Sequence, residues 1–254
     1  MRKIRFPVLF FATALGALPV RAALPVSEMA GLFTGAVGIG ASEYYKADLV
    51  PQEPRWKTPP AIDAGVRNAL VWSNTKLAAT MSDIFLFGVM PAAAFASPLA
   101  TNHDYGRAAL TIGEAAVVTG VITQVAKFSV ARGRPFAYYG NDYSSPDSRL
   151  SFFSGHTSYS FALALSSAML LSESYPQYSA GIYATSLLIA ALPGYLRIAA
   201  DKHYLTDVLT GAIVGSAIAY GITRMQLNTN SVQYGDERRL QLQRHAAIRI
   251  GDPG

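Results

Sequence analysis

The sequence predicts an all-α protein that folds as a single bundle of about five to six helices. Apolar residues make up 51% of the 254 residues and charged residues 15%, against about 25% charged in an average soluble domain. No segment alternates with period two for long, and Ala, Leu and Ile dominate, which favours helices over strands. No linker is visible, so one domain is expected.

The first 22 residues have the pattern of a secretory signal peptide. A basic start at 1–5 precedes an apolar run at 6–18, and Val20-Arg21-Ala22 places small residues where a signal peptidase reads. An apolar run of about 13 residues is short of the roughly 20 that a membrane span needs. We therefore favour cleavage over a retained helix and expect export to the bacterial cell envelope.

The charge of the chain argues against a nucleic-acid partner. The formal net charge is +5, but four of the cations lie within the first 22 residues. The remainder is nearly balanced, whereas binding through counterion release needs a standing excess of Lys and Arg. The sequence contains no cysteine, which excludes disulfides, a thiol nucleophile and a thiolate metal site.

Residues 23–73 are interpreted as a Pro-rich N-terminal extension. A short apolar, Gly-rich run at 29–41 is followed by Pro51, Pro54, Pro59 and Pro60. Proline at this density is typical of a surface connection.

Residues 74–223 form the predicted helical domain. Its five longer segments are 74–96, 107–126, 157–171, 180–196 and 206–223. Residues 174–196 carry no charge and can cross a bilayer, and we favour a membrane-embedded bundle. Asp83 and Glu114 interrupt two of the other segments, and a structural role, paired or solvated, is expected for both.

Residues 224–254 are interpreted as a polar C-terminal tail. Leu240 and Leu242, and then Ile248 and Ile250, alternate as in short strands. A small β-hairpin and a solvated arm both remain open, and no chemistry is assigned to the tail.

Three polar clusters lie at the ends of the apolar segments. Each alone is explained by the preference of cations for helix C-termini or of Ser for helix starts. Their occurrence together points to one shared site, and counting membrane crossings from an inside N-terminus places all three on the outer face. The clusters are Lys127-x6-Arg134-Pro135, Ser154-Gly155-His156 and Arg197-x5-His203-x3-Asp207.

The cations of these clusters are suited to a tetrahedral oxyanion. Lys127, Arg134 and Arg197 offer several charge-assisted donors, and the Arg forks match phosphate oxygens. No cluster of Asp and Glu has the spacing of a Mg²⁺ or Zn²⁺ site, so these side chains would supply the charge compensation. A mechanism without metal or other cofactor is expected.

The two histidines suit nucleophilic and acid–base roles. Asp207 lies four residues after His203, so its carboxylate can accept from one imidazole nitrogen and leave the other facing phosphorus. His156 can act as general acid, because an unperturbed pKa near 6.5 lets it donate a proton around neutral pH. His103 and His245 lack such neighbours, and we expect them to be structural.

The three motifs resemble the signature of the type 2 phosphatidic acid phosphatase and vanadium haloperoxidase superfamily, over about residues 107–223. The resemblance implies that His203 attacks phosphorus to give a phosphohistidine, or ligates vanadate in the peroxidases, and that Asp207 orients it. It implies an acid–base role for His156. The residues implied to bind the oxyanion are Lys127, Arg134, Ser154, Gly155 and Arg197.

Two positions depart from the family pattern. Phe153 stands where the family has Pro before Ser-Gly-His, and Leu196 stands where it has Ser before the third-motif Arg. The first removes a turn constraint and the second a hydroxyl near the anion. Neither removes a chemical group of the expected mechanism.

The resemblance implies a metal-independent phosphatase with its site on the periplasmic side. Expected substrates are phosphate monoesters or diphosphates of membrane lipids, such as phosphatidate, an isoprenoid diphosphate or lipid A phosphate. The alternatives are a soluble periplasmic nonspecific acid phosphatase that takes small phosphoesters, then a vanadium haloperoxidase, and a structural membrane protein with a decayed site. The head group is not specified by any pattern in residues 23–73 or 137–150.

Overall fold

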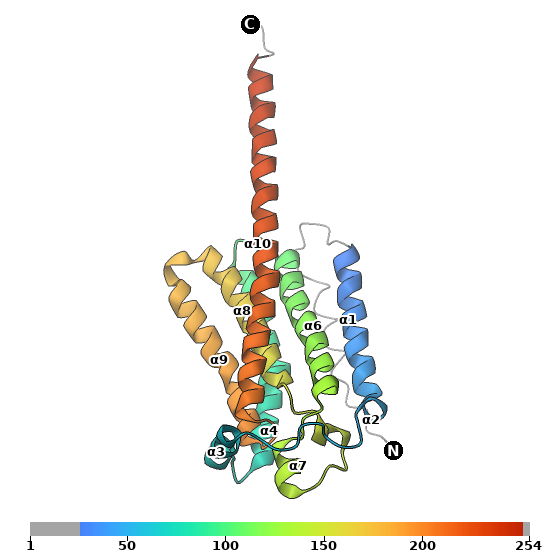
Figure 1. Ribbon diagram of the computed structural model, residues 1–254. Helices are drawn as coiled ribbons and strands as arrows, with labels where there is room; N and C mark the ends of the chain where they lie inside the picture. Colours follow the sequence, from blue (N-terminus) through green and yellow to red (C-terminus); the bar gives the residue numbers. More distant parts are fainter. Residues whose placement is uncertain (1–25, 251–254) are drawn as a thin grey trace.

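The computed structural model describes residues 26–250, with side-chain surroundings for residues 26–229 (Figure 1). The expected signal peptide, 1–22, lies outside the described residues. The α-helices are α1 (Val26–Tyr44), α2 (Lys46–Leu49), α3 (Ala61–Leu70), α4 (Thr75–Ile84), α5 (Met90–Ala96), α6 (Tyr105–Val130), α7 (Pro135–Gly140), α8 (Gly155–Ser174), α9 (Ser179–Ala199) and α10 (Leu205–Ile250).

Short turns of other helix types join these elements. A π-helical turn, η3 (Phe85–Val89), connects α4 to α5, and 3₁₀ turns occupy η4 (Ser97–Ala100), η5 (Pro146–Arg149) and η6 (Pro176–Tyr178). No strand occurs between residues 26 and 250. The all-α prediction is therefore confirmed.

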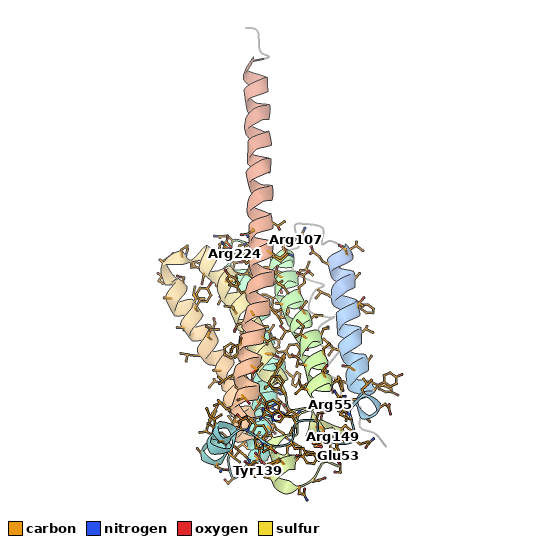
Figure 2. All side chains as sticks on the ribbon, viewed as in Figure 1. Glu53, Arg55, Arg107, Tyr139, Arg149 and Arg224 are labelled. Carbon is orange, nitrogen blue, oxygen red and sulfur yellow. The ribbon has the colours of Figure 1, made fainter. Side chains whose placement is uncertain are left out.

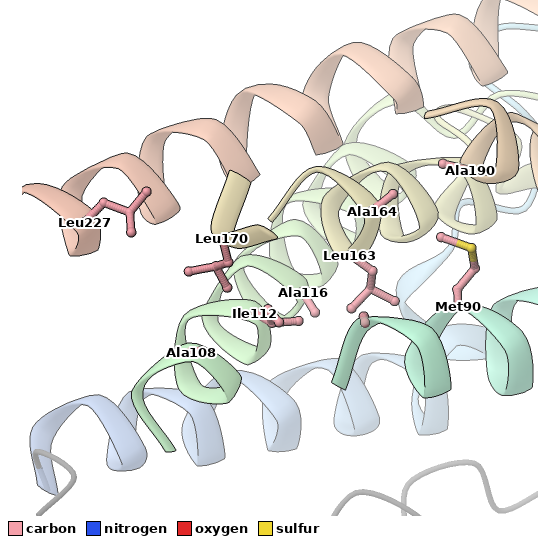
Figure 3. Close-up of a cluster of buried hydrophobic side chains, with 10 residues drawn as sticks. Met90, Ala108, Ile112, Ala116, Leu163, Ala164, Leu170, Ala190 and Leu227 are labelled. Atoms are coloured by element: carbon pink, nitrogen blue, oxygen red, sulfur yellow. The ribbon is translucent and has the colours of Figure 1, made fainter. Parts of the chain in front are cut away.

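Helix α8 lies at the centre of the bundle, where it packs against α10, α9 and α6. The main apolar core joins side chains of α5, α6, α8, α9 and α10 (Figure 3). Its larger members are Met90, Ile112, Leu163, Leu170 and Leu227, and Ala side chains fill the spaces between them. The core therefore ties together the helices whose ends carry the polar motifs.

Two glycines let α10 approach α8 closely. A Cβ built on Gly211 would lie 2.7 Å from the carbonyl oxygen of Ser154, and one on Gly215 would lie 2.1 Å from that of Ser158. Real Cβ atoms do not come so close to backbone. The Gly-x3-Gly spacing thus sets the distance between the two helices that carry the second and third motifs.

The segment interpreted as a Pro-rich connection contains helices. Residues 29–41 lie within α1, which packs along α6, and α3 follows the prolines (Figure 1). The glycines of the apolar run favour a loop by propensity. Tertiary packing overrides this preference, because Gly35 lets α1 approach Val117 of α6.

The sequence left a C-terminal β-hairpin open, and this possibility is wrong. Helix α10 continues without a break to Ile250 and projects beyond the bundle, at the end opposite α3 and α7 (Figure 1). The apolar alternation at 240–250 is therefore carried on a helix.

Four helical stretches are long and apolar enough to cross a membrane: Thr75–Ala100, Tyr105–Val130, Pro176–Ala199 and Leu205–Thr229. Large apolar side chains such as Phe87, Leu188 and Ile213 are exposed on them. Charged residues gather at both ends: Glu53, Arg55 and Arg149 at one, Arg107 and Arg224 at the other (Figure 2). These features support membrane association.

Candidate active site

The three polar motifs meet at one end of the bundle, where α6 and α9 finish and α8 and α10 begin (Figure 1). Ala131 ends α6 in the left-handed conformation (φ 46°), and Pro135 opens α7. Ser154 caps α8 by accepting from the backbone N–H of Thr157. The backbone N–H of Ser154 donates to the carbonyl of Asp207 at 3.0 Å, which joins the second motif to the third.

His203 is buried and faces Arg134. Its Nε2 lies 3.3 Å from Nη1 of Arg134. Because a guanidinium can only donate, this contact requires a lone pair on Nε2 and places the imidazole proton on Nδ1. Burial, and then the cations Arg134, Arg197 and Lys127, hold the pKa of His203 well below its ordinary 6.5. The imidazole is therefore neutral at physiological pH, and its Nε2 lone pair is directed at Arg134.

Asp207 lies behind the imidazole at a longer distance than the sequence suggested. Its Oδ2 is 3.6 Å from Nδ1 of His203, which exceeds a hydrogen bond. Oδ2 already accepts from the hydroxyl of Ser151 at 2.5 Å and from the backbone N–H of Tyr204 at 2.9 Å. Its Oδ1 accepts from Arg132 at 2.6 Å. Asp207 thus caps the start of α10 as well as facing His203.

His156 contacts a carboxylate that the motifs do not include. Its Nε2 lies 2.7 Å from Oδ1 of Asp83, and Nη1 of Arg197 lies 3.6 Å from the same oxygen. Phe87, one turn after Asp83, packs edge-on against the His156 ring. Asp83 therefore links two predicted site residues, where the sequence suggested only structural pairing or solvation.

The remaining predicted binding residues surround the same space. Arg134 is oriented by two carbonyls, those of Asp147 at 2.6 Å and Lys202 at 3.2 Å. A Cβ built on Gly155 would lie 3.5 Å from Nζ of Lys127, so the ammonium lies beside the start of α8. The structure brings all eight predicted site residues to one end of the bundle.

The structure adds site residues that the sequence did not predict. Arg132 is 1% exposed and joins Asp207 to Asp63 of α3, and Ser151 supports Asp207 from the loop before α8. Arg132 could have been found from its position inside the first motif. Asp63 had no signal, because it stands alone in a Pro-rich segment. Among residues 26–229, no group of three His, Asp or Glu side chains could hold a metal ion.

Comparison with known proteins identifies the helical domain. Residues 108–231 match the PAP2 superfamily. The chain is 32% identical over 144 residues to the probable lipid phosphate phosphatase 4 of Arabidopsis thaliana, covering 46% of this chain and 47% of that protein. It is 29% identical over 129 residues to the phospholipid phosphatase 1 of Rattus norvegicus, covering 39% and 44%.

A solved structure is also similar: that of the first transmembrane PAP2 type phosphatidylglycerolphosphate phosphatase from Bacillus subtilis. The sequence identity is 21% and the TM-score 0.44, over 80% of this chain and 96% of that one. The chain spans about half the length of the curated relatives that it matches. Together with the three motifs, the match over residues 108–231 shows that this chain carries a PAP2 superfamily domain.

Proposed function

We propose that the protein is a metal-independent phosphatase that hydrolyses the phosphate monoesters or diphosphates of membrane lipids through a phosphohistidine. One observation carries the proposal: the buried, neutral imidazole of His203 presents Nε2 toward Arg134 and has Asp207 behind Nδ1. A nucleophile aimed at a guanidinium that binds oxyanions is the arrangement that phosphoryl transfer to histidine needs.

In the first step, the Nε2 lone pair of His203 attacks phosphorus and the bond to the leaving oxygen breaks. Burial and the charge of Arg197 lower the pKa of His156, and the Asp83 carboxylate and the bound phosphate oppose this. His156 gives its proton to that oxygen, so the alcohol or phosphate departs protonated. The charge on the transferring oxygens is held by Lys127, Arg134 and Arg197. The Nδ1 proton of His203 faces Asp207 as the ring gains positive charge.

In the second step, water attacks the phosphohistidine and the P–N bond breaks. His156, now neutral, takes the proton from that water, and phosphate leaves. His203 recovers its lone pair and His156 its proton, so the cycle closes without another reactant. Ser154 and Gly155 bind the oxyanion beside His156 in this mechanism.

A lipid substrate is supported by the position of the site. The motifs lie at the end of helices that can cross a membrane, where a head group would reach them while its chains stay in the bilayer. The curated relatives are named as lipid phosphate and phospholipid phosphatases. The proposal also includes export, with the site on the periplasmic face. The exposed apolar side chains of these helices favour this over a soluble acid phosphatase.

The test uses protein purified in detergent and incubated with phosphatidate, an isoprenoid diphosphate and lipid A, with phosphate release as the readout. The wild type should release phosphate in the presence of EDTA, and His203→Ala should lose this activity. His103→Ala is the matched control, because His103 lies at the opposite end of α6, beside Glu173. Absence of release from every lipid, or full inactivation by EDTA, would reject the proposal. Extraction without detergent would favour the soluble alternative, and bromide oxidation with vanadate and peroxide the haloperoxidase.

A further inference from the structure

A carboxylate from outside the PAP2 match is buried beside the motifs. Asp63 is 0% exposed and is the one buried residue of α3, a helix that otherwise lies on the surface. Aspartate is almost never fully buried unless it is paired. The burial of Asp63 therefore calls for a specific partner, and its surroundings supply two.

Both oxygens of Asp63 are used at the start of α10. Oδ1 accepts from the backbone N–H of Thr206 at 2.9 Å, and Oδ2 accepts from the Thr206 hydroxyl at 2.6 Å. Oδ2 also accepts from Nη2 of Arg132 at 2.7 Å. Asp63 thus caps, from another helix, the turn that separates His203 from Asp207.

Arg132 links Asp63 to the pair formed by His203 and Asp207. Its Nη1 donates to Asp207 at 2.6 Å while its Nη2 donates to Asp63. The guanidinium lies 3.8 Å from the ring centre of Trp56 and 4.3 Å from that of Tyr204. These rings and the two carboxylates fix the guanidinium in a buried position.

The charges of this group have a consequence for His203. Asp207 and Arg132 alone form a neutral pair, which would give little support to an imidazole that becomes positive on phosphorylation. Asp63 adds a second carboxylate and makes the group net negative. We propose that Asp63 is a positioning residue that acts through Arg132, keeping the charge of Asp207 available to His203 during phosphoryl transfer. This rests on the proposed phosphohistidine mechanism.

After burial, the groups that lower the pKa of His203 are cations or histidine, and the negative group opposes them. They come from α6, the segment before α7, α8 and α9. They are Lys127, Arg134, His156 and Arg197. Asp207 is the carboxylate next to the ring, whereas Asp83 and Asp147 act on Arg197 and Arg134. Loss of the effective charge of Asp207 would therefore remove the negative side chain that faces the imidazole.

The experiment separates the charge of Asp63 from its role in docking α3. Asp63→Asn keeps the shape and removes the charge, and Asp63→Glu keeps the charge and alters the shape. Arg67→Gln is the matched control, because Arg67 fastens α3 through its double contact with Asp201, at 2.7 Å each, without touching Arg132. Thermal unfolding and kcat as a function of pH are measured for all three, with the lipid that the wild type hydrolyses.

We expect Asp63→Asn to lower kcat about tenfold and to move the acidic limb of its pH profile about one unit to lower pH. The direction follows from losing a negative charge, which makes His203 harder to protonate and phosphohistidine harder to form. Asp63→Glu should keep the wild-type limb, and Arg67→Gln should lose stability with the limb unmoved. The phosphate of the substrate titrates near pH 6 in every variant, so differences between variants report the protein.

An unmoved limb in Asp63→Asn would overturn the inference, as would equal movement of the limb in Arg67→Gln. If Asp63→Asn does not accumulate, Asp63→Glu is compared with the wild type. An acidic limb displaced from that of the wild type, despite the retained carboxylate, would contradict the inference. An inactive wild type would instead reject the proposed function. In that event, NMR titration of the four histidines still measures the pKa of His203, which should fall in Asp63→Asn.

Discussion

Replacing Gly215 by Ala should separate the two helices that carry the second and third motifs. A Cβ at this position would lie 2.1 Å from the carbonyl oxygen of Ser158, against 3.4 Å for ordinary contact, so the helices must part by about 1.3 Å. The obstacle is backbone and cannot rotate away. Overpacking of this kind costs about 1–3 kcal/mol of unfolding free energy, and a shift of about 1 Å between reacting groups can cost on the order of 100-fold in rate.

The assay compares Gly215→Ala with Gly221→Ala, a control on the same helix where nothing lies within 4 Å of the added Cβ. Thermal unfolding in detergent and kcat for phosphate release are measured for both. The control should be neutral, or more stable by up to about 1 kcal/mol through the helix propensity of Ala. Equal behaviour of the two variants would refute the reasoning that close approach at Gly215 aligns the site.

Four further outcomes are expected. The free energy of unfolding should fall as pH drops below about 6.5, because the unfolded chain binds protons that buried His203 and His156 reject. His203→Gln should reduce this dependence and leave the part that is due to His156, as followed by thermal unfolding across pH. Arg134→Lys should lower kcat/KM about 100-fold despite the retained charge, since an ammonium cannot replace the two-pronged guanidinium; steady-state kinetics check this. Asp83→Asn should weaken the hold on His156 and move the alkaline limb of the kcat profile to lower pH, because a carboxylate favours the protonated ring. Vanadate should inhibit phosphate release, and addition of EDTA should leave the rate unchanged.

The helical bundle could be predicted from the sequence, and so could the three motifs that the structure brings to one end of it, because both depend on local spacing. Long apolar segments rich in Ala and Leu form helices in many environments. The spacing of His203 and Asp207 places both at the start of one helix, and the Gly-x3-Gly pair of α10 brings that helix against α8. These features require little knowledge of distant parts of the chain.

The residues that were missed depend on contacts between distant segments. Helix α1 contains glycines that disfavour a helix in isolation, and its packing on α6 compensates for them. Asp63 lies 69 residues from Arg132, and Asp83 lies 73 residues from His156. A single carboxylate in a Pro-rich or apolar stretch has no spacing that predicts its partner, so the partner is identified only by the fold.

The nature of the covalent intermediate is tested most directly by trapping it. The protein is mixed with a lipid phosphate, quenched in base, where phosphohistidine survives, and digested for mass spectrometry. Phosphate should be found on the peptide that contains His203 and should be absent in His203→Ala. His156→Ala should still be labelled by a substrate whose leaving group departs without a proton donor. Label on His156 instead, or full phosphate release by His203→Ala, would contradict nucleophilic attack by His203.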